Sequence, residues 1–252
     1  MTERQRPGST SGPAAGENGA SRDARDRPAT RRPGLLFDLD GTLAQTEHIH
    51  LAAFNTLLAA SGRELDEAAF VRHVSGRANE DIMAFLFPRA GAEERARLAN
   101  AKEASFRAIA AADGVAATPG AAALLAWARS GRVATGLVTN APLANAQMMV
   151  EALGLADAFD TVVSADRLPR SKPHPDPYLA AIEALGLART ATVAIEDSRT
   201  GIAAAAAAGI DVVALSTAQT AASLTDSSAA LVVEDLADPR LYAFLRQRFA
   251  LT

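Results

Sequence analysis

The sequence predicts an α/β fold in which a doubly wound parallel sheet carries a small inserted α-helical domain. Short apolar runs alternate with stretches of helical periodicity, as in sheets wrapped by helices. A long helical stretch separates the first two runs, and acidic or polar residues follow directly on several of them. With 252 residues, 49% of them apolar, the chain can bury a substantial core.

Four apolar runs are interpreted as buried strands, because each is short, aliphatic or β-branched, and bounded by polar residues or glycine. A further short run of β-branched residues is a candidate fifth strand. The four runs are residues 34–38, 133–138, 191–195 and 210–215, and the fifth is 161–164.

The interval between the first two strands, residues 39–132, is far longer than one crossover helix needs, and it is helical in pattern. Helices are predicted over 47–61, 66–74, 80–87 and 93–112, with Gly62, Gly76, Pro88 and Gly91 as breaks. We therefore expect an inserted helical domain over 47–115 and a core formed by 33–46 and 116–252. Residues 1–32, rich in small and charged residues and proline, are predicted to be a disordered tail.

Two later segments carry helix signals. An alanine-rich helix over 203–208 is predicted to start at Gly201 and to stop at Gly209. The proline-rich segment 172–177 is predicted to form a stiff loop that leads into a helix capped by Asp176.

Composition excludes several function classes. A net charge of −4 and a pI near 5.6 give no general attraction for nucleic acid or anionic membranes, so phosphate binding must come from a local site. The absence of cysteine excludes disulfides, thiol nucleophiles and thiolate metal sites. No apolar run approaches the roughly 20 residues that span a bilayer. We expect a soluble, cytoplasmic, monomeric protein whose partner is a small molecule.

Acidic residues follow two of the predicted strands. Asp38 and Asp40 come at the end of the first, and Glu196 and Asp197 follow the run 191–195. Ligands of parallel sheets bind beyond the carboxyl ends of the strands, so the four carboxylates are predicted to converge there. Their repulsion would be offset by a cation, and oxygen ligands suit Mg²⁺. Helix-capping turn acids would explain either pair alone, but explain both pairs poorly.

Only two lysines, Lys102 and Lys172, stand against 23 arginines. A compact ammonium is not interchangeable with a guanidinium, so these lysines are candidates to offset the charge of a phosphate. The alternative is a solvated charge, on a loop for Lys172 and on a helix face for Lys102. Thr139 and Asn140, at the end of the second strand, offer a hydroxyl and an amide for phosphate oxygens.

The order of these motifs resembles the haloacid dehalogenase (HAD) superfamily. The motifs are Asp38-Leu-Asp-Gly-Thr42, then Thr139, Lys172 and Glu196-Asp197. The resemblance covers the chain from Gly34 onward, and the helical insertion is similar to the cap of the β-phosphoglucomutase-like branch. Within that branch, residues 138–142 look most like the second motif of sugar-phosphate phosphatases.

The resemblance implies a mechanism. Asp38 would attack phosphorus and form an aspartyl phosphate, while Asp40 would protonate the departing alcohol and then activate water. Mg²⁺ would be held by the Asp38 carboxylate, the Asp40 backbone carbonyl and Asp197, with Glu196 binding it directly or supporting its ligands. Thr139, Asn140 and Lys172 would hold the phosphoryl oxygens. The resemblance thus implies a Mg²⁺-dependent phosphatase acting on a small phosphorylated sugar or polyol.

Cap residues are expected to select the substrate. Thr46 and His50 match the hinge and first cap helix of the mutase-like branch, and Lys102 matches a lysine that reaches down from the cap. Asn79 stands where the mutases place an arginine that grips a second phosphate, and Arg77 lies two residues earlier. This departure favours a phosphatase.

Two alternatives remain open at this point. A β-phosphoglucomutase-type phosphosugar mutase is possible if Arg77 takes over the role of the missing arginine. A phosphoryl-accepting signalling module is the second, since receiver domains combine the same acidic cluster with Mg²⁺, a threonine and a lysine. Asp40, placed to hydrolyse the intermediate, and the helical insertion argue against the signalling module.

Overall fold

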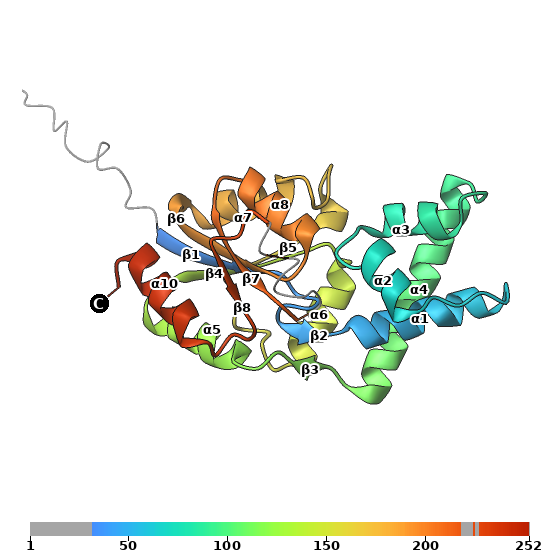
Figure 1. The fold of residues 1–252 in the computed structure, drawn as a ribbon, viewed down its shortest axis with the longest axis horizontal. Coiled ribbons are helices and arrows are strands. Elements are labelled where there is room, and N and C mark those ends of the chain that lie inside the picture. Colours follow the sequence, from blue (N-terminus) through green and yellow to red (C-terminus); the bar gives the residue numbers. More distant parts are fainter. Residues whose placement is uncertain (1–31, 218–223, 225–226, 252) are drawn as a thin grey trace, which may run out of the picture. The chain divides into compact units, whose positions relative to one another are not determined.

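A computed structural model describes residues 32–217, 224 and 227–251, and its centre is a six-stranded sheet (Figure 1). The strands run in the order β5-β4-β1-β6-β7-β8, and all neighbours pair in parallel. Their bounds are β1 (Arg32–Phe37), β4 (Ala134–Thr139), β5 (Thr161–Ser164), β6 (Leu187–Glu196), β7 (Asp211–Leu215) and β8 (Leu231–Val233). The fold-class prediction is confirmed, and each of the five predicted runs forms a strand.

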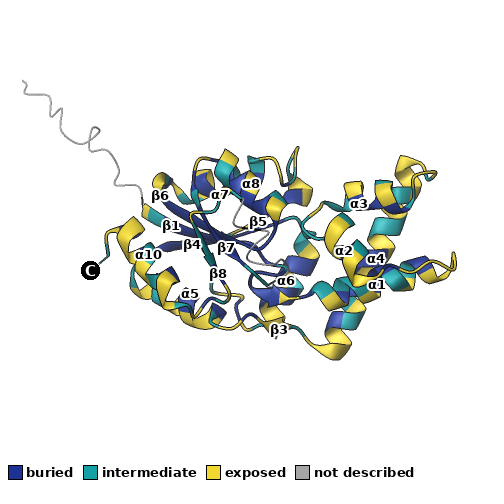
Figure 2. Cartoon of the chain, in the orientation of Figure 1, coloured by how far each residue is buried: buried dark blue, intermediate teal, exposed yellow. Residues whose placement is uncertain are grey.

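Helices cover both faces of the sheet (Figure 1). Leu35 and Phe37 of β1 enter one apolar cluster and Leu36 enters the other, as the two-residue period of a strand requires. Because both faces are covered, the inner strands β4, β1, β6 and β7 are buried in their carboxyl-terminal parts (Figure 2), and these parts are mostly apolar. One face carries α5 (Ala121–Ser130), α6 (Leu143–Ala152) and α10 (Pro239–Phe249), and the other α7 (Asp176–Leu185) and α8 (Arg199–Ala207).

A helical insert, defined here as residues 46–115, lies between the short strands β2 (Ala44–Gln45) and β3 (Ala116–Ala117). These two strands pair antiparallel and bring the ends of the insert together. The insert has its own apolar cluster, which includes Phe54, Phe70 and Met83. Its helices are α1 (Glu47–Ala59), α2 (Glu67–His73), α3 (Asn79–Leu86) and α4 (Ala92–Asp113), close to the predicted ranges. That the insert acts as a separate cap stays a prediction.

The predicted start of the alanine-rich helix is wrong. α8 begins at Arg199, because the Ser198 side chain accepts a hydrogen bond from the Gly201 backbone N–H at 3.1 Å and caps the helix. Gly201 lies instead in the first turn, where a Cβ would come 2.0 Å from the Glu196 carboxylate. This glycine therefore makes room for a functional side chain.

The prediction that Asp176 caps the following helix is also wrong. α7 begins at Asp176 itself, with Pro175 in front of it. The Asp176 carboxylate accepts two hydrogen bonds from the guanidinium of Arg170, at 2.8 and 2.9 Å, and so closes the proline-rich loop instead.

Within the part of the chain that the structure describes, no helix is both long and apolar enough to cross a membrane. The predicted N-terminal tail lies outside the described residues, except for Arg32, which begins β1.

Candidate active site

The candidate site lies at the carboxyl edge of the three central strands, β4, β1 and β6, which are neighbours in the sheet. Asp38 follows β1, and its backbone N–H donates to the Ile195 carbonyl at 3.0 Å, which holds it beside the end of β6. A cavity of about 90 Å³ opens here, between this edge and the helical insert. It is lined by the core residues Asp38, Asp40, Thr139, Asn140, Lys172 and Asp197 and by the insert residues Thr46, His50, Arg77 and Lys102.

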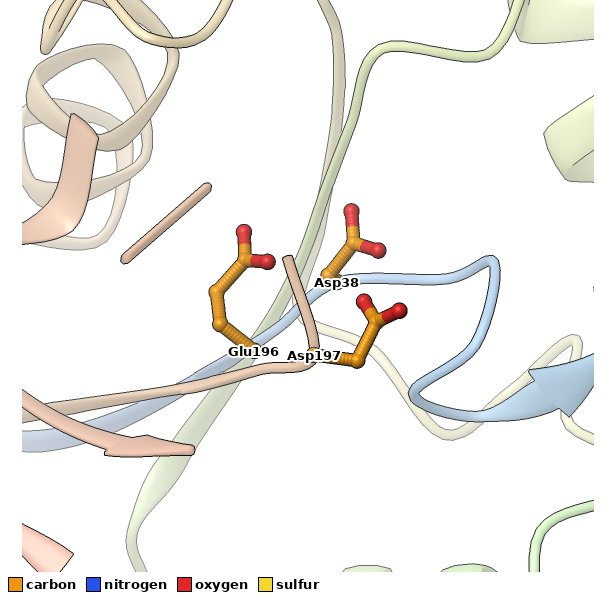
Figure 3. A group of neighbouring side chains, drawn as sticks. All are labelled: Asp38, Glu196 and Asp197. Carbon is orange, nitrogen blue, oxygen red and sulfur yellow. The ribbon is translucent and has the colours of Figure 1, made fainter. Parts of the chain in front are cut away.

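Three buried carboxylates converge at this edge (Figure 3). One oxygen from each of Asp38, Glu196 and Asp197 lies within 4.8 Å of the others. Gly41, at φ +79°, lets the chain turn against this group, since a Cβ there would come 2.1 Å from Asp197 Oδ2. The Asp40 carboxylate does not belong to the group. The predicted cluster of four carboxylates is therefore a cluster of three.

Lys172 supplies the positive charge on the core side. Its Nζ donates to Asp38 Oδ1 at 2.6 Å, to Glu196 Oε1 at 2.6 Å and to the Val138 carbonyl at 2.7 Å. The side chain is only 3% exposed. All three ammonium donors are thus used, and the charge is fixed between two of the carboxylates.

Asn140, which is predicted to bind phosphate, lines the cavity and also bonds the backbone of Lys172. Its side-chain amide donates to the Lys172 carbonyl at 3.3 Å and accepts from the Lys172 N–H at 3.1 Å. Asn140 thus holds the backbone of the lysine loop. Thr139, also predicted to bind phosphate, lies buried at the end of β4, and its hydroxyl accepts from the Ala141 N–H at 3.0 Å.

Burial and mutual repulsion disfavour charge on the acidic group. Burial, partly offset by Lys172, raises the pKa of Asp38 to about 8, and Glu196 and Asp40 add to the shift. Burial, followed by the charges of Asp38 and Glu196, raises the pKa of Asp197 well above its usual range. Although burial opposes it, contact with Asp38 and Glu196 raises the pKa of Lys172. One ammonium cannot balance three carboxylates, so this all-oxygen group fits a hard divalent cation.

Tyr178, on α7, is a site residue that the sequence analysis missed. Its buried hydroxyl donates to Glu196 Oε1 at 2.6 Å, and its ring centroid lies 5.2 Å from Lys172 Nζ. Nothing in its sequence context distinguishes it from an ordinary core tyrosine, because its role depends on how α7 packs against β6.

Asp40 faces the helical insert. Its Oδ1 accepts from the Thr46 hydroxyl at 2.6 Å and lies 3.0 Å from His50 Nε2. His50 Nδ1 lies 2.8 Å from Lys102 Nζ. An ammonium can only donate, so Nδ1 accepts and the imidazole proton is assigned to Nε2, where it is donated to Asp40. Burial opposes ionisation of Asp40, but His50 and Thr46 outweigh it and lower its pKa.

Lys102 lies in a more apolar place than Lys172. Its Nζ lies 4.7 Å from the ring centroid of Phe54 and 5.5 Å from that of Phe106, and its carboxylate partner is Glu103, at 3.0 Å. Burial lowers its pKa, although Glu103 opposes the shift. The sequence analysis did not single out Glu103.

The side chains of Arg77 and Asn79 have different surroundings in the structure. Arg77 is exposed at the cavity, and no hydrogen bond or ion pair to its guanidinium occurs among the described residues. Asn79 points inward instead, with its amide donating to Glu103 Oε1 at 2.7 Å.

The arrangement of these residues agrees with the comparison to known families. A family model for haloacid dehalogenase-like hydrolases matches residues 35–215. The chain belongs to this family. Within it, the chain is a phosphatase-type hydrolase that acts on small phosphorylated metabolites.

Several relatives support this placement. Protein CbbY of Rhodobacter capsulatus is 35% identical, and the match covers 71% of this chain and 83% of that protein. Validoxylamine A 7'-phosphate phosphatase of Streptomyces hygroscopicus subsp. limoneus is 32% identical, over 81% of this chain and 94% of that protein. The crystal structure of a CbbY mutant from Rhodobacter sphaeroides with xylulose-(1,5)bisphosphate superimposes with a TM-score of 0.75 at 27% identity, covering 82% and 96% of the two chains.

Proposed function

We propose that this protein is a Mg²⁺-dependent phosphatase that hydrolyses a small phosphorylated sugar or polyol through a phosphoryl group carried on Asp38. The observation that carries the proposal is the setting of the Asp38 carboxylate. Lys172 binds Oδ1 at 2.6 Å, whereas Oδ2 has no hydrogen-bond partner among the described residues. A buried carboxylate fixed at one oxygen is oriented to attack with the other.

The carboxylates of Asp38 and Asp197 and the backbone carbonyl of Asp40 would hold the Mg²⁺ ion. Glu196 would bind it or stay with Lys172 and Tyr178, which already share its Oε1. When bound, the ion supplies positive charge that offsets the negative charge on the phosphate ester and on the carboxylates.

The chemical steps fall to two carboxylates. An Asp38 oxygen forms a bond to phosphorus while the bond from phosphorus to the alcohol oxygen breaks. The Asp40 carboxyl group, which must take up a proton when the ester binds, gives that proton to the alcohol oxygen. The Asp40 carboxylate then takes a proton from a water molecule, whose oxygen attacks phosphorus. Phosphate leaves and the Asp38 carboxylate is restored.

Asp40 is placed for both of its tasks by the helical insert. Thr46 and His50 hold one of its oxygens, Oδ1, and Lys102 fixes the tautomer of His50. On the core side, the ammonium of Lys172 and the hydroxyl of Thr139 would stabilise the charge of the phosphoryl group in transfer.

The relatives and the walls of the cavity support the substrate class. The cavity is closed in by residues of both the core and the insert, which suits a small ester rather than a polymer. One relative is named as a phosphatase of validoxylamine A 7'-phosphate, and the CbbY crystal contains xylulose-(1,5)bisphosphate. We infer that the insert acts as a cap, with Arg77 offering a charge to the distal end of the substrate.

The mutase alternative is less well supported. The amide of Asn79 is bonded to Glu103, so the position where mutases place an arginine does not offer a cation to the cavity. Arg77 remains available. Conversion of β-glucose 1-phosphate into glucose 6-phosphate, without release of phosphate, would favour the mutase.

The test is phosphate release from a panel of sugar and polyol phosphates with Mg²⁺. We expect release from at least one ester, loss of release with EDTA, and no release by Asp38→Asn. The matched control is Asp113→Asn, the same change at an exposed residue at the end of α4, which should behave like the parent. Equal release by the parent and Asp38→Asn, or no release by either, would contradict the proposal.

A further inference from the structure

A buried polar cluster outside the reacting atoms joins the helical insert to the core. Glu103 of α4 is its centre and is only 5% exposed. Glu103 Oε2 accepts from the amide of Asn145, on α6, at 2.5 Å, and Oε1 accepts from Asn79 at 2.7 Å. Asn145 is fully buried, and its own Oδ1 accepts from Arg107 Nη1 at 2.7 Å. We call these four residues the Glu103 cluster.

The cluster crosses the boundary between the two parts of the molecule. Glu103, Asn79 and Arg107 belong to the insert, whereas α6 with Asn145 packs against the sheet. A hydrogen bond to a charged carboxylate contributes more net free energy than one between neutral groups. Separation of the insert from α6 would remove the Asn145 donor from Glu103. This hydrogen bond therefore favours the arrangement in which the insert contacts the core.

The same carboxylate also orients a residue of the candidate site. Glu103 Oε1 lies 3.0 Å from Lys102 Nζ, and Lys102 in turn lies 2.8 Å from His50 Nδ1. Core, insert and Asp40 are therefore connected by one unbroken series of hydrogen bonds, which begins at Asn145.

We propose that Glu103 and Asn145 are positioning residues, which hold the helical insert against the core and thereby aim Lys102 at His50. The inference rests on the proposed function only for its effect on turnover. The contact between the helical insert and the core does not depend on turnover and can be measured without any reaction.

A reciprocal exchange tests the pair. Asn145→Asp places a carboxylate against that of Glu103, and their repulsion should open the insert. Adding Glu103→Gln restores an amide-to-carboxylate hydrogen bond with its direction reversed, and Arg107 remains to pair with the new carboxylate. The matched control is Asn55→Asp, the same substitution inside the insert, at an amide whose hydrogen bonds to described residues are all to the Leu65 backbone.

The first readout is a distance. The chain has no cysteine, so spin labels can be attached at Ala96→Cys on α4 and Ala184→Cys on α7, both exposed. With Mg²⁺ and inorganic phosphate present, pulsed EPR should show a longer and broader distance distribution for Asn145→Asp. The double exchange and Asn55→Asp should keep the parent distribution. An unchanged distribution in Asn145→Asp, or no recovery in the double exchange, would overturn the proposal.

The second readout separates positioning from folding. On the most active ester of the panel, kcat of Asn145→Asp should fall roughly 10- to 100-fold, as expected for loss of a hydrogen bond to a charged group. The double exchange should recover most of it. A kcat equal to that of Asn55→Asp would overturn the proposal. If the parent releases no phosphate, the proposed function fails, whereas the distance measurement still decides whether the cluster holds the insert.

Discussion

The two lysines of the chain lie on opposite sides of one cavity and behave in opposite ways. Lys172, on the core side, and Lys102, in the insert, are equally buried. Lys172 contacts two carboxylates and a carbonyl, and its pKa is raised despite its burial. Lys102 contacts one carboxylate, an imidazole and two aromatic rings, and burial lowers its pKa.

Because burial lowers the pKa of both lysines, the larger number of carboxylates around Lys172 accounts for the opposite directions of the two pKa shifts. The core side has a permanent charge, suited to offsetting the negative charge of a phosphoryl group and to orienting Asp38. The insert side has a lysine that acts through His50 on Asp40. We therefore expect the two sides to respond differently to substitution and to pH.

The largest effect is expected from Lys172→Met. It removes the positive charge from a group of three buried carboxylates, so the free energy of unfolding should fall by about 3–5 kcal/mol. Phosphate release should fall roughly 10²- to 10³-fold or more. Urea unfolding, with and without Mg²⁺, measures the stability, and the phosphate assay measures the activity. Mg²⁺ should recover part of the stability. Stability within about 1 kcal/mol of the parent in EDTA would contradict this account.

Lys102→Met should have a smaller effect on stability. Glu103 keeps Asn79 and Asn145 as donors, so a loss of about 1–2 kcal/mol is expected. kcat should still fall roughly 10-fold or more, because His50 loses the group that fixes its tautomer. The measurement compares the loss of kcat with the loss of unfolding free energy in Lys102→Met, and sets this ratio against the same ratio for Lys172→Met. A stability loss as large as that of Lys172→Met would remove the distinction between the two sides.

The pH dependence of stability should reflect the core side. The pKa of Asp38 is about 8 in the fold against 3.8 ordinarily. Between these values the folded state binds more protons than the unfolded state, so in EDTA the free energy of unfolding should fall as pH rises from about 4 to about 8. Asp38→Asn should show a flatter slope, and stabilisation by Mg²⁺ should grow with pH. Parallel slopes for parent and variant in urea titrations would contradict the assigned shift.

The smallest effect is expected from Arg77→Ala, which removes an exposed charge of the insert that pairs with none of the described residues. KM should rise roughly 2- to 5-fold for esters with a second anionic group, since exposed charge pairs are weak, and kcat should stay unchanged. Esters with one phosphate and no other charge serve as controls within the same variant. An equal rise in KM for both kinds of ester would argue against a distal subsite at Arg77.

The core side was predictable from sequence for physical reasons. A parallel sheet brings the ends of β1, β4 and β6 to one edge, so the polar residues that follow these strands were expected to meet. The scarcity of lysine singled out Lys172. In contrast, the sequence did not show that the Asp40 side chain lies apart from the other three carboxylates. Its direction depends on the end of β1 at Phe37 and on the turn at Gly41, which a strand pattern does not specify.

What the sequence analysis missed depends on packing between distant elements. Tyr178 and Asn145 act through contacts with Glu196 and Glu103, which no local pattern encodes. The hydrogen bonds between the Asn140 side chain and the backbone of Lys172 were not predicted either, because they join two loops far apart in the sequence. The three-residue strand β8 was too short to stand out from its surroundings.

The central claim is that Asp38 carries the phosphoryl group, and trapping that group tests it most directly. Asp40→Asn, with Mg²⁺ and p-nitrophenyl phosphate, is suited to this, because nitrophenolate leaves without a proton whereas hydrolysis of the intermediate needs the Asp40 carboxylate. We predict a burst of about one nitrophenolate per chain, and, after acid quench, one phosphoryl group in the peptide that contains Asp38, by mass spectrometry. Turnover without a burst, or a phosphoryl group on any other residue, would contradict the account.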